Sequence, residues 1–273
     1  MKAENLAARP DPSRDQHLMT NQGTIGRMVS AAGPTRRDVV LEIGAGSGIL
    51  TKALAKSGAK VIAVEVDRAF AKTLGKIGAD NVEIIYANAL DVIDKIEFNK
   101  IVSNIPYSIC EPLMRKLFER KFDIAVLSVP ENFYRIIASE PGEKNHSVLS
   151  LKTQSFFRVS LLFKIKKEDF TPPPRTESVA VAIRPLSKGD YEKRPEKFLL
   201  REIFVQKDMK LKNSLREALI ELNKQLFCRH FTKNMARAEI KKMKLARRLL
   251  EKKAGEMRSG DFEALGKRLR PCP

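Results

Sequence analysis

The sequence predicts an α/β fold with a mostly parallel sheet and an antiparallel edge, followed by a small, basic, all-α C-terminal domain. Within the first 150 residues, short apolar runs alternate with stretches of helical spacing. Continuous apolar strands separated by helices are typical of a parallel sheet that is covered on both faces. After Pro185 the strand-like runs stop and only helical spacing remains. Hydrophobic residues make up 43% of the chain, which is enough for a core.

The first part of the chain contains five apolar runs that we expect to be strands. They are separated by glycine-rich or polar turns and by segments with helical periodicity. The expected strands are 39–43, 60–66, 82–86, 101–103 and 122–129, and the expected helices are 49–56, 69–76 and 112–119.

Two later runs, 159–165 and 178–183, are expected to form a β-pair joined through Pro172, Pro173 and Pro174. Because proline cannot continue a central strand, it suits the connection between the two strands. The pair would close one edge of the sheet.

The C-terminal part is expected to be helical throughout. Helical spacing covers 198–205, 210–222, 233–253 and 261–269. We therefore divide the chain into a first domain, 1–184, and a second domain, 185–273, with 186–195 as a polar linker.

The charge is strongly positive and unevenly placed. The chain holds 51 Lys and Arg against 33 Asp and Glu, a formal net charge of +18. Residues 185–273 hold 24 basic and 12 acidic residues, so most of the excess lies in the second domain. A polyanionic partner is favoured, because each cation that binds a phosphate releases a counterion. The alternative is a solvated surface that only keeps the protein soluble.

Several classes of protein are excluded. The sequence contains no run of eighteen apolar residues, so we expect no membrane span. Residues 1–15 contain no apolar signal core. The cysteines, Cys110, Cys228 and Cys272, form no C-x-x-C pair, so we expect neither a metal site nor a disulfide framework. The sequence predicts a reduced, cytoplasmic protein.

A glycine-rich turn follows the first expected strand, where residues 42–48 read EIGAGSG. Glycines let the backbone approach a ligand, and the next helix directs its first amides toward it. The dinucleotide pattern fails, because its third glycine would fall at Ile49. The remaining pattern, E-x-G-x-G-x-G with Gly44 and Gly46, resembles the first motif of methyltransferases that use S-adenosylmethionine.

Two residues at later strand ends complete the expected cofactor site. Glu65 ends the second strand, where a carboxylate suits two ribose hydroxyls. Asn88 follows the third strand, where such enzymes contact the adenine of the cofactor. Asp67 is better explained as the N-cap of the next helix.

The fourth strand ends in Asn104, Ile105, Pro106 and Tyr107, a motif typical of methyltransferases that act on an amino nitrogen. The lone pair of an adenine amino group is delocalised into the ring. Acceptors at the Asn104 side chain and the Ile105 carbonyl would favour a pyramidal, nucleophilic nitrogen. Pro106 would fix the backbone, and Tyr107 would stack on an extruded base. A plain β-turn would also accept these residue types.

The order of these motifs resembles the ribosomal RNA small-subunit adenine dimethyltransferases, the KsgA family, over nearly the whole chain. Residues 15–19, DQHLM, resemble the N-terminal element of that family, which lies over the cofactor. Residues 170–178 resemble its F-x-P-x-P-x-x-x-S segment, in which Phe170 would stack on the other face of the adenine. The resemblance implies a Rossmann-like methyltransferase fold and cofactor contacts at Gln16, His17, Met19, Gly44, Glu65, Asn88 and Asn104.

The resemblance also implies the reaction and the partner. Two methyl groups would pass from S-adenosylmethionine to each of two adjacent adenosines, in a hairpin near the 3′ end of small-subunit rRNA. The substrate would be a pre-ribosomal small subunit, and a monomer would suffice.

The chain departs from the family pattern at four places. Asn88 replaces the usual Asp, which predicts weaker cofactor binding because a neutral acceptor is weaker than a charged one. Leu18 and Asn21 replace a Phe and an Asp, and 207–210 replaces a basic run. We therefore expect RNA contacts to have moved to the basic residues of 241–248.

Two other functions stay open at this point. A resistance-type methyltransferase of large-subunit rRNA shares the Asn104 motif, although Asn213, Ser214 and Leu215 favour the small-subunit family. An rRNA-binding assembly factor or transcription-factor-like protein with secondary catalysis is the other alternative.

Overall fold

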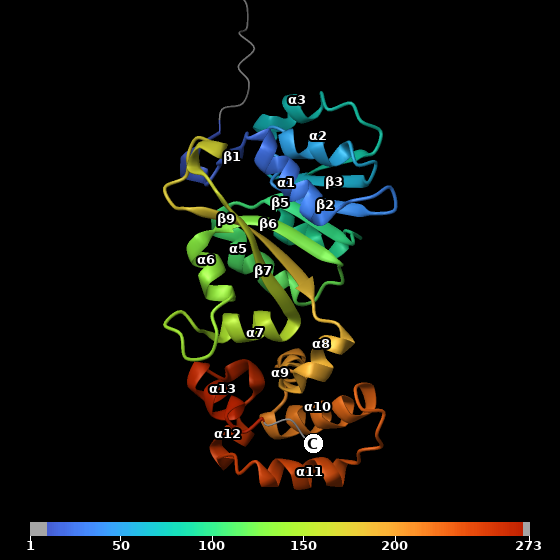
Figure 1. Cartoon of the computed structure of the whole chain (residues 1–273), viewed down its shortest axis with the longest axis vertical. Helices are drawn as coiled ribbons and strands as arrows, with labels where there is room; N and C mark the ends of the chain where they lie inside the picture. The colour runs from blue at the N-terminus through green and yellow to red at the C-terminus, as the bar shows by residue number, and fades with distance from the viewer. Residues whose placement is uncertain (1–9, 270–273) are drawn as a thin grey trace, which may run out of the picture. The chain divides into compact units, whose positions relative to one another are not determined.

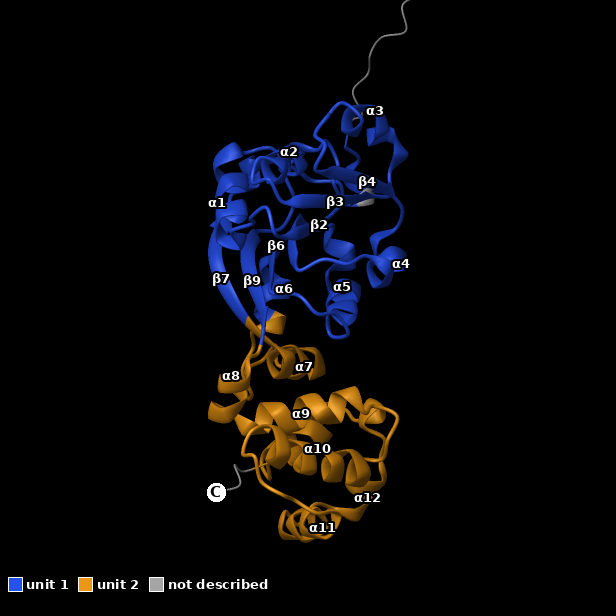
Figure 2. Cartoon of the chain, turned by 90° about the vertical axis from the view of Figure 1, so that its right-hand side faces the viewer, with its two compact units in different colours: residues 1–135, 159–185 blue, residues 136–158, 186–273 orange. Residues whose placement is uncertain are grey.

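The computed structural model describes residues 10–269, which form two compact units (Figure 2). Unit 1 holds the described residues up to Arg135 together with Val159–Pro185. Unit 2 holds Ile136–Arg158 and the chain from Leu186 onward. Cys272 and most of the polar N-terminal stretch considered above lie outside the described residues.

A seven-stranded sheet in the order β4-β3-β2-β5-β6-β9-β7 forms the centre of unit 1 (Figure 1). The first five of these strands are paired in parallel, and β9 lies antiparallel to β6. The predicted α/β fold with an antiparallel edge is therefore confirmed. The strands are β2 (Val39–Ile43), β3 (Lys60–Glu65), β4 (Val82–Tyr86), β5 (Lys100–Asn104), β6 (Ile124–Pro130), β7 (Phe157–Ile165) and β9 (Ser178–Pro185).

The strand order places a switch point between β2 and β5. From β2 the chain moves outward through β3 and β4, and it then returns to the other side of β2 as β5. The carboxyl ends of β2 and β5 therefore lie side by side, and the loops that follow them diverge. Ligands of open α/β sheets bind at such a point.

Helices cover the sheet of unit 1. Ile25 and Met28 of α1 and Leu54 of α2 share one apolar cluster with Val40 and Val102 of the sheet. The sequence analysis missed α1, which begins after the N-cap Asn21. The helices are α1 (Gln22–Ala32), α2 (Ile49–Ala55), α3 (Ala71–Leu74), α4 (Ala89–Val92), α5 (Cys110–Leu117) and α6 (Glu131–Ile137), which continues into unit 2.

A second, two-stranded sheet joins the N-terminal segment to the proline-rich segment. β1 (Leu18–Met19) lies antiparallel to β8 (Phe170–Thr171), with Leu18 opposite Thr171 and Met19 opposite Phe170. Met19 and Phe170 both face the core of unit 1 and are 5% and 2% exposed. This pairing fixes residues 15–18 beside the switch point.

Unit 2 is helical, as predicted, but differs from the prediction in three places. The expected linker contains a helix, α8, because Ser187 caps it by accepting from the Asp190 amide. The single helix expected over 233–253 is wrong, because the chain bends at Lys244, which has a φ of 49°. The helices are α7 (Val148–Phe156), α8 (Lys188–Lys193), α9 (Pro195–Val205), α10 (Leu211–Gln225), α11 (Lys233–Lys242), α12 (Arg247–Glu251) and α13 (Ser259–Gly266).

The third difference concerns the boundary of the units. The expected division at 184/185 lies one residue from the observed change at Pro185, but Ile136–Arg158 belongs to unit 2. The reason is that Val148, Leu151 and Phe156 of α7 pack against the core of unit 2.

Within residues 10–269, no helix is long and apolar enough to cross a membrane. No group of three or more His, Cys, Asp or Glu side chains in this range is placed to hold a metal ion. Cys110 and Cys228 are free thiols.

Candidate active site

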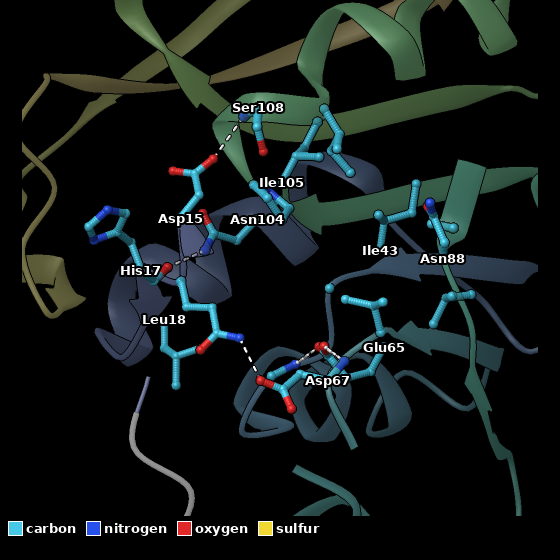
Figure 3. Close-up of a pocket in the computed structure, with 18 of the residues that line it drawn as sticks. Asp15, His17, Leu18, Ile43, Glu65, Asp67, Asn88, Asn104, Ile105 and Ser108 are labelled. Carbon is cyan, nitrogen blue, oxygen red and sulfur yellow. Dashed lines mark hydrogen bonds between the residues drawn. The ribbon is translucent and has the colours of Figure 1, made fainter. Parts of the chain in front are cut away.

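A cavity of about 380 Å³ opens at the carboxyl ends of β2, β3 and β5 (Figure 3). Its wall comes from the glycine-rich turn, the ends of β3 and β4, the loop after β5 and residues 15–18, which we call the N-terminal strap. The lining residues are Asp15, Gln16, His17, Leu18, Ile43, Gly44, Gly46, Val64, Glu65, Val66, Asp67, Phe70, Ala87, Asn88, Ala89, Asn104, Ile105, Pro106, Tyr107, Ser108 and Ile109.

The glycine-rich turn needs glycine for its backbone conformation and, at Gly46, for lack of space. Gly44 and Gly46 adopt φ values of 76° and 52°, which favour glycine. A Cβ on Gly46 would lie 2.5 Å from Cδ2 of Leu18, and one on Gly44 would lie 3.4 Å from Cδ of Pro106. The glycines therefore let the turn approach both the strap and the loop after β5.

Glu65 is buried behind the glycine-rich turn. Its Oε2 accepts from the Gly46 amide and its Oε1 accepts from the Asp67 amide, each at 2.8 Å. Each carboxylate oxygen keeps further acceptor capacity, so the fixed side chain can still accept from a ligand in the cavity. Asp67 caps the following helical turn, as predicted.

Glu42 lies behind the cavity wall and does not line it. The side chain is 1% exposed, and no hydrogen-bond partner for its Oε2 is found among the described residues. Burial raises the pKa of Glu42 to about 8, and the charge of Glu65 acts in the same direction. The Glu42 carboxyl is therefore mostly protonated at neutral pH.

Asn104 is held by only one end of its amide. Its Nδ2 donates to the carbonyl of His17 at 2.7 Å. Its Oδ1 is buried and accepts no hydrogen bond from any described residue. A buried acceptor without a partner costs about 1–3 kcal/mol. This atom is thus poised to accept a hydrogen bond from a ligand.

Tyr107 is fixed at its hydroxyl and along its ring. The hydroxyl shares a 2.5 Å hydrogen bond with Ser178, at the start of β9. The ring stacks on that of His17, with centroids 6.0 Å apart and planes inclined by 27°. Burial raises the pKa of the Tyr107 phenol above its ordinary value, so the group stays neutral.

The strap is attached to three other parts of unit 1. Asp15 Oδ2 accepts from the Ser108 amide at 2.7 Å, and Gln16 Nε2 donates to Asp67 at 2.9 Å. His17 Nδ1 lies 2.9 Å from the carbonyl of Pro172. The strap therefore spans the cavity from the β5 loop to the end of β3.

Asn88 lines the cavity opposite Asn104 and also begins α4. Its Oδ1 accepts from the Leu90 amide at 3.0 Å, which makes it an N-cap. The carbonyl end of the side chain is thus committed to the backbone.

The structure brings most of the predicted site residues together and separates two of them. Gln16, His17, Gly44, Gly46, Glu65, Asn88, Asn104, Ile105, Pro106 and Tyr107 all line the cavity. Met19 and Phe170 do not. They are cross-strand partners whose side chains turn into the core, so the cofactor contact at Met19 and the base-stacking role of Phe170 stay predictions.

Val66, Asp15 and Ser108 are among the lining residues that were given no individual role from the sequence. Val66 is 70% exposed at the cavity rim, although it continues an apolar strand. Asp15 and Ser108 meet across 93 positions of the chain. Each of the three is next to or within a motif, since Val66 follows Glu65, Ser108 follows Tyr107 and Asp15 begins the 15–19 element, but no local pattern indicates that Asp15 binds Ser108.

A family model and the curated relatives show the family to which the chain belongs. A family model described as ribosomal RNA adenine dimethylase matches residues 10–254. The probable ribosomal RNA small subunit methyltransferase A of Methanosarcina mazei is 40% identical over 206 residues, which cover 74% of this chain and 75% of that protein. The ribosomal RNA small subunit methyltransferase A of Thermotoga petrophila is 41% identical over 207 residues, which cover 75% and 79%.

A solved structure has the same fold. The crystal structure of a dimethyladenosine transferase from Plasmodium falciparum superposes with a TM-score of 0.62 at 26% identity. The match covers 92% of this chain and 98% of the other.

Proposed function

The chain belongs to the ribosomal RNA adenine dimethylase family, and from this premise we propose that the cavity of unit 1 is its active site. The protein is an S-adenosylmethionine-dependent rRNA adenine dimethyltransferase that acts on small-subunit rRNA. The finer proposal is that it dimethylates two adjacent adenosines in a hairpin near the 3′ end, within a pre-ribosomal particle, in the cytoplasm and as a monomer.

The residues around the β2–β3 end of the cavity fit S-adenosylmethionine. Gly44 and Gly46 of the glycine-rich turn line the cavity with positive φ values, and Glu65 presents a fixed carboxylate for ribose hydroxyls. Gln16, His17 and Asn88 complete the set that would hold the cofactor. When bound, the cofactor supplies the electrophilic methyl group of its sulfonium.

The observation that carries the proposal is the unpaired Oδ1 of Asn104. An adenine amino group brings two N–H donors into a cavity whose wall holds a buried, unpaired acceptor. A hydrogen bond from the amino group to Oδ1 would draw the nitrogen toward a pyramidal geometry and make its lone pair available. The bond from Nδ2 to the His17 carbonyl prevents the amide from turning its donor end toward the substrate.

Tyr107 would orient the base. Its hydroxyl is tied to Ser178 and its ring already stacks on His17, so little conformational freedom is lost when a base arrives. An adenosine of a structured RNA must leave its stack to reach this cavity, and a fixed aromatic ring offsets part of that cost.

Methyl transfer to purified immature small subunits tests the proposal. We expect radiolabel from S-adenosylmethionine to appear as dimethyladenosine in small-subunit rRNA, as identified by mass mapping of the nucleosides. Asn104→Ala should lower the rate about 100-fold or more, in line with the loss of one preorganised polar group in other active sites. RNA affinity should stay close to that of the wild type.

Other outcomes would contradict the proposal. Retention of RNA without label would favour an rRNA-binding factor, and label confined to large-subunit rRNA would favour the resistance-type activity. Loss of RNA affinity together with rate in Asn104→Ala would show that Asn104 has a different role.

A further inference from the structure

We propose that Asp15 is a positioning residue for methyl transfer. Its carboxylate caps the helical segment that follows the Asn104–Tyr107 motif, and so it ties the N-terminal strap to the loop that would hold the target base. This inference rests on the proposed function of the cavity.

The segment after the motif lacks a cap of its own. A helical turn over Tyr107–Ile109 leads directly into α5, and its N-cap residue is Pro106. Proline has no side-chain acceptor, so the first amides of this segment have no local side-chain partner. Ser108 N donates instead to Asp15 Oδ2 at 2.7 Å, from a residue 93 positions away.

The backbone of Asp15 is shaped for this contact. It has a φ of 61°, in the left-handed region, and closes the turn of Pro12–Arg14 by donating its amide to Pro12 at 3.1 Å. A glycine would adopt this conformation without steric cost, but it would leave the Ser108 amide without an acceptor. Among other residues, Asp and Asn tolerate the left-handed region best, and Asp adds a charge that suits a helix N-terminus.

The strap thereby holds the β5 loop on both sides of Tyr107. Before Tyr107, the His17 carbonyl accepts from Asn104 Nδ2, and after it, the Asp15 carboxylate accepts from Ser108. The ring of His17 contacts Tyr107 between these two points. Displacement of either anchor would move the proposed base-stacking ring relative to Asn104.

Loss of the Asp15 anchor should therefore affect the chemical step more than ground-state binding. We expect the rate of methyl transfer to fall about tenfold, which corresponds to about 1.4 kcal/mol of activation free energy. The KM for RNA should change by less than about threefold, because the phosphate contacts that dominate RNA affinity lie elsewhere.

The test uses two substitutions at one position in the full-length chain. Asp15→Gly keeps the left-handed turn and removes the acceptor, whereas Asp15→Asn keeps the turn and a neutral acceptor. We expect kcat to fall about tenfold or more in Asp15→Gly and by less in Asp15→Asn. Hydrogen exchange of the Ser108 amide, measured without donor or RNA, should become faster in Asp15→Gly and change less in Asp15→Asn.

Ser187→Ala is the matched control, since it removes the cap of α8 in unit 2. It should lower the thermal midpoint to a similar degree and leave kcat unchanged. Wild-type kcat in Asp15→Gly would overturn the proposal, and so would a lower kcat with unchanged Ser108 exchange. If the wild-type enzyme methylates no RNA, the proposed function fails, while the exchange measurement still decides whether Asp15 caps Ser108.

Discussion

Asn88 shows how one atom of a side chain can limit cofactor binding. Its Oδ1 already accepts from the Leu90 amide, so the neutral carbonyl would be shared between the helix start and any ligand. A carboxylate at this position could cap α4 with one oxygen and accept from the cofactor with the other. We therefore expect Asn88→Asp to tighten S-adenosylmethionine binding about three- to tenfold, because charged acceptors bind more strongly.

Isothermal titration with S-adenosylmethionine measures this effect. Asn88→Ala serves as the opposite control and should weaken binding, since it removes both the N-cap and the acceptor. Equal or weaker binding by Asn88→Asp would show that Asn88 does not limit cofactor affinity.

Glu42 predicts a pH dependence of stability. Its pKa is about 8 in the folded state, compared with an ordinary value of 4.5, so the folded protein keeps a proton that the unfolded chain loses. Stability contributed by this group is complete below about pH 4.5 and is lost as the pH rises toward 8. The slope between these values approaches about 1.4 kcal/mol per pH unit.

Replacement by an uncharged isostere isolates this contribution. The difference in thermal midpoint between Glu42→Gln and the wild type should shift in favour of the variant as the pH rises from 5 to 8. Contributions from all other groups are common to both proteins and cancel in the difference. A difference that does not vary with pH would mean that Glu42 is ionised in the folded state.

Among the structural elements, those with continuous apolar runs were predictable from the sequence. The five parallel strands were found because burial on both faces selects unbroken runs of apolar residues. α1 was missed because Gly23 and Gly26 weaken its helical signal, and its stability comes from Ile25 and Met28 in the core. Two-residue strands such as β1 and β8 carry no periodicity, so the burial of Phe170 could not be foreseen.

The same distinction applies to the candidate site. Residues that end a strand within a recognisable motif, such as Glu65 and Asn104, were found because the carboxyl ends of parallel strands lie at the same edge of a sheet. The contact of Asp15 with Ser108 depends on the path of the strap, which no local pattern encodes.

The connection between α11 and α12 presents a basic surface. Lys241, Lys244, Arg247 and Arg248 are exposed there and form no ion pair with any described residue, whereas Lys242 pairs with Glu239. The bend at Lys244 separates the two short helices that carry them. We expect this surface to contact phosphates of the rRNA, which would position the enzyme without specifying sequence.

The double variant Lys241→Gln/Arg247→Gln tests this surface. It should weaken rRNA binding and reduce the slope of log Kd against log salt by about two, one for each lost phosphate contact. Lys52→Gln/Lys56→Gln, at an exposed position of α2 and at its exposed C-cap, changes the net charge equally and should leave the slope close to that of the wild type. Equal effects of the two pairs would mean that only net charge matters.

At the scale of the whole molecule, each of the two units is built from two separate segments of the chain. The chain leaves unit 1 after Arg135, returns at Val159 and leaves again after Pro185. Composition changes visibly only at the last of these points, because 136–158 contains the same residue types as its neighbours. The assignment of α7 to unit 2 depends on packing and was therefore not predictable.

This interleaving predicts that the catalytic part cannot be isolated by cutting at the visible boundary. A chain ending at Pro185 keeps α7 but loses the core that covers Val148, Leu151 and Phe156. Exposing a fully buried apolar side chain lowers the free energy of unfolding by about 1.5–3 kcal/mol. The loss is smaller for these three side chains, because they are only partly buried in the full-length protein. We expect this fragment to bind a hydrophobic dye, to self-associate in size-exclusion chromatography and to melt below the full-length protein.

The additional substitutions Val148→Thr and Leu151→Gln should reduce dye binding and association, since they remove the apolar surface that the missing helices covered. A monodisperse fragment that binds no dye and melts with the full-length protein would show that unit 1 folds without the α7 packing, and the sequence-based division at 184/185 would then describe the folding units better than the packing does.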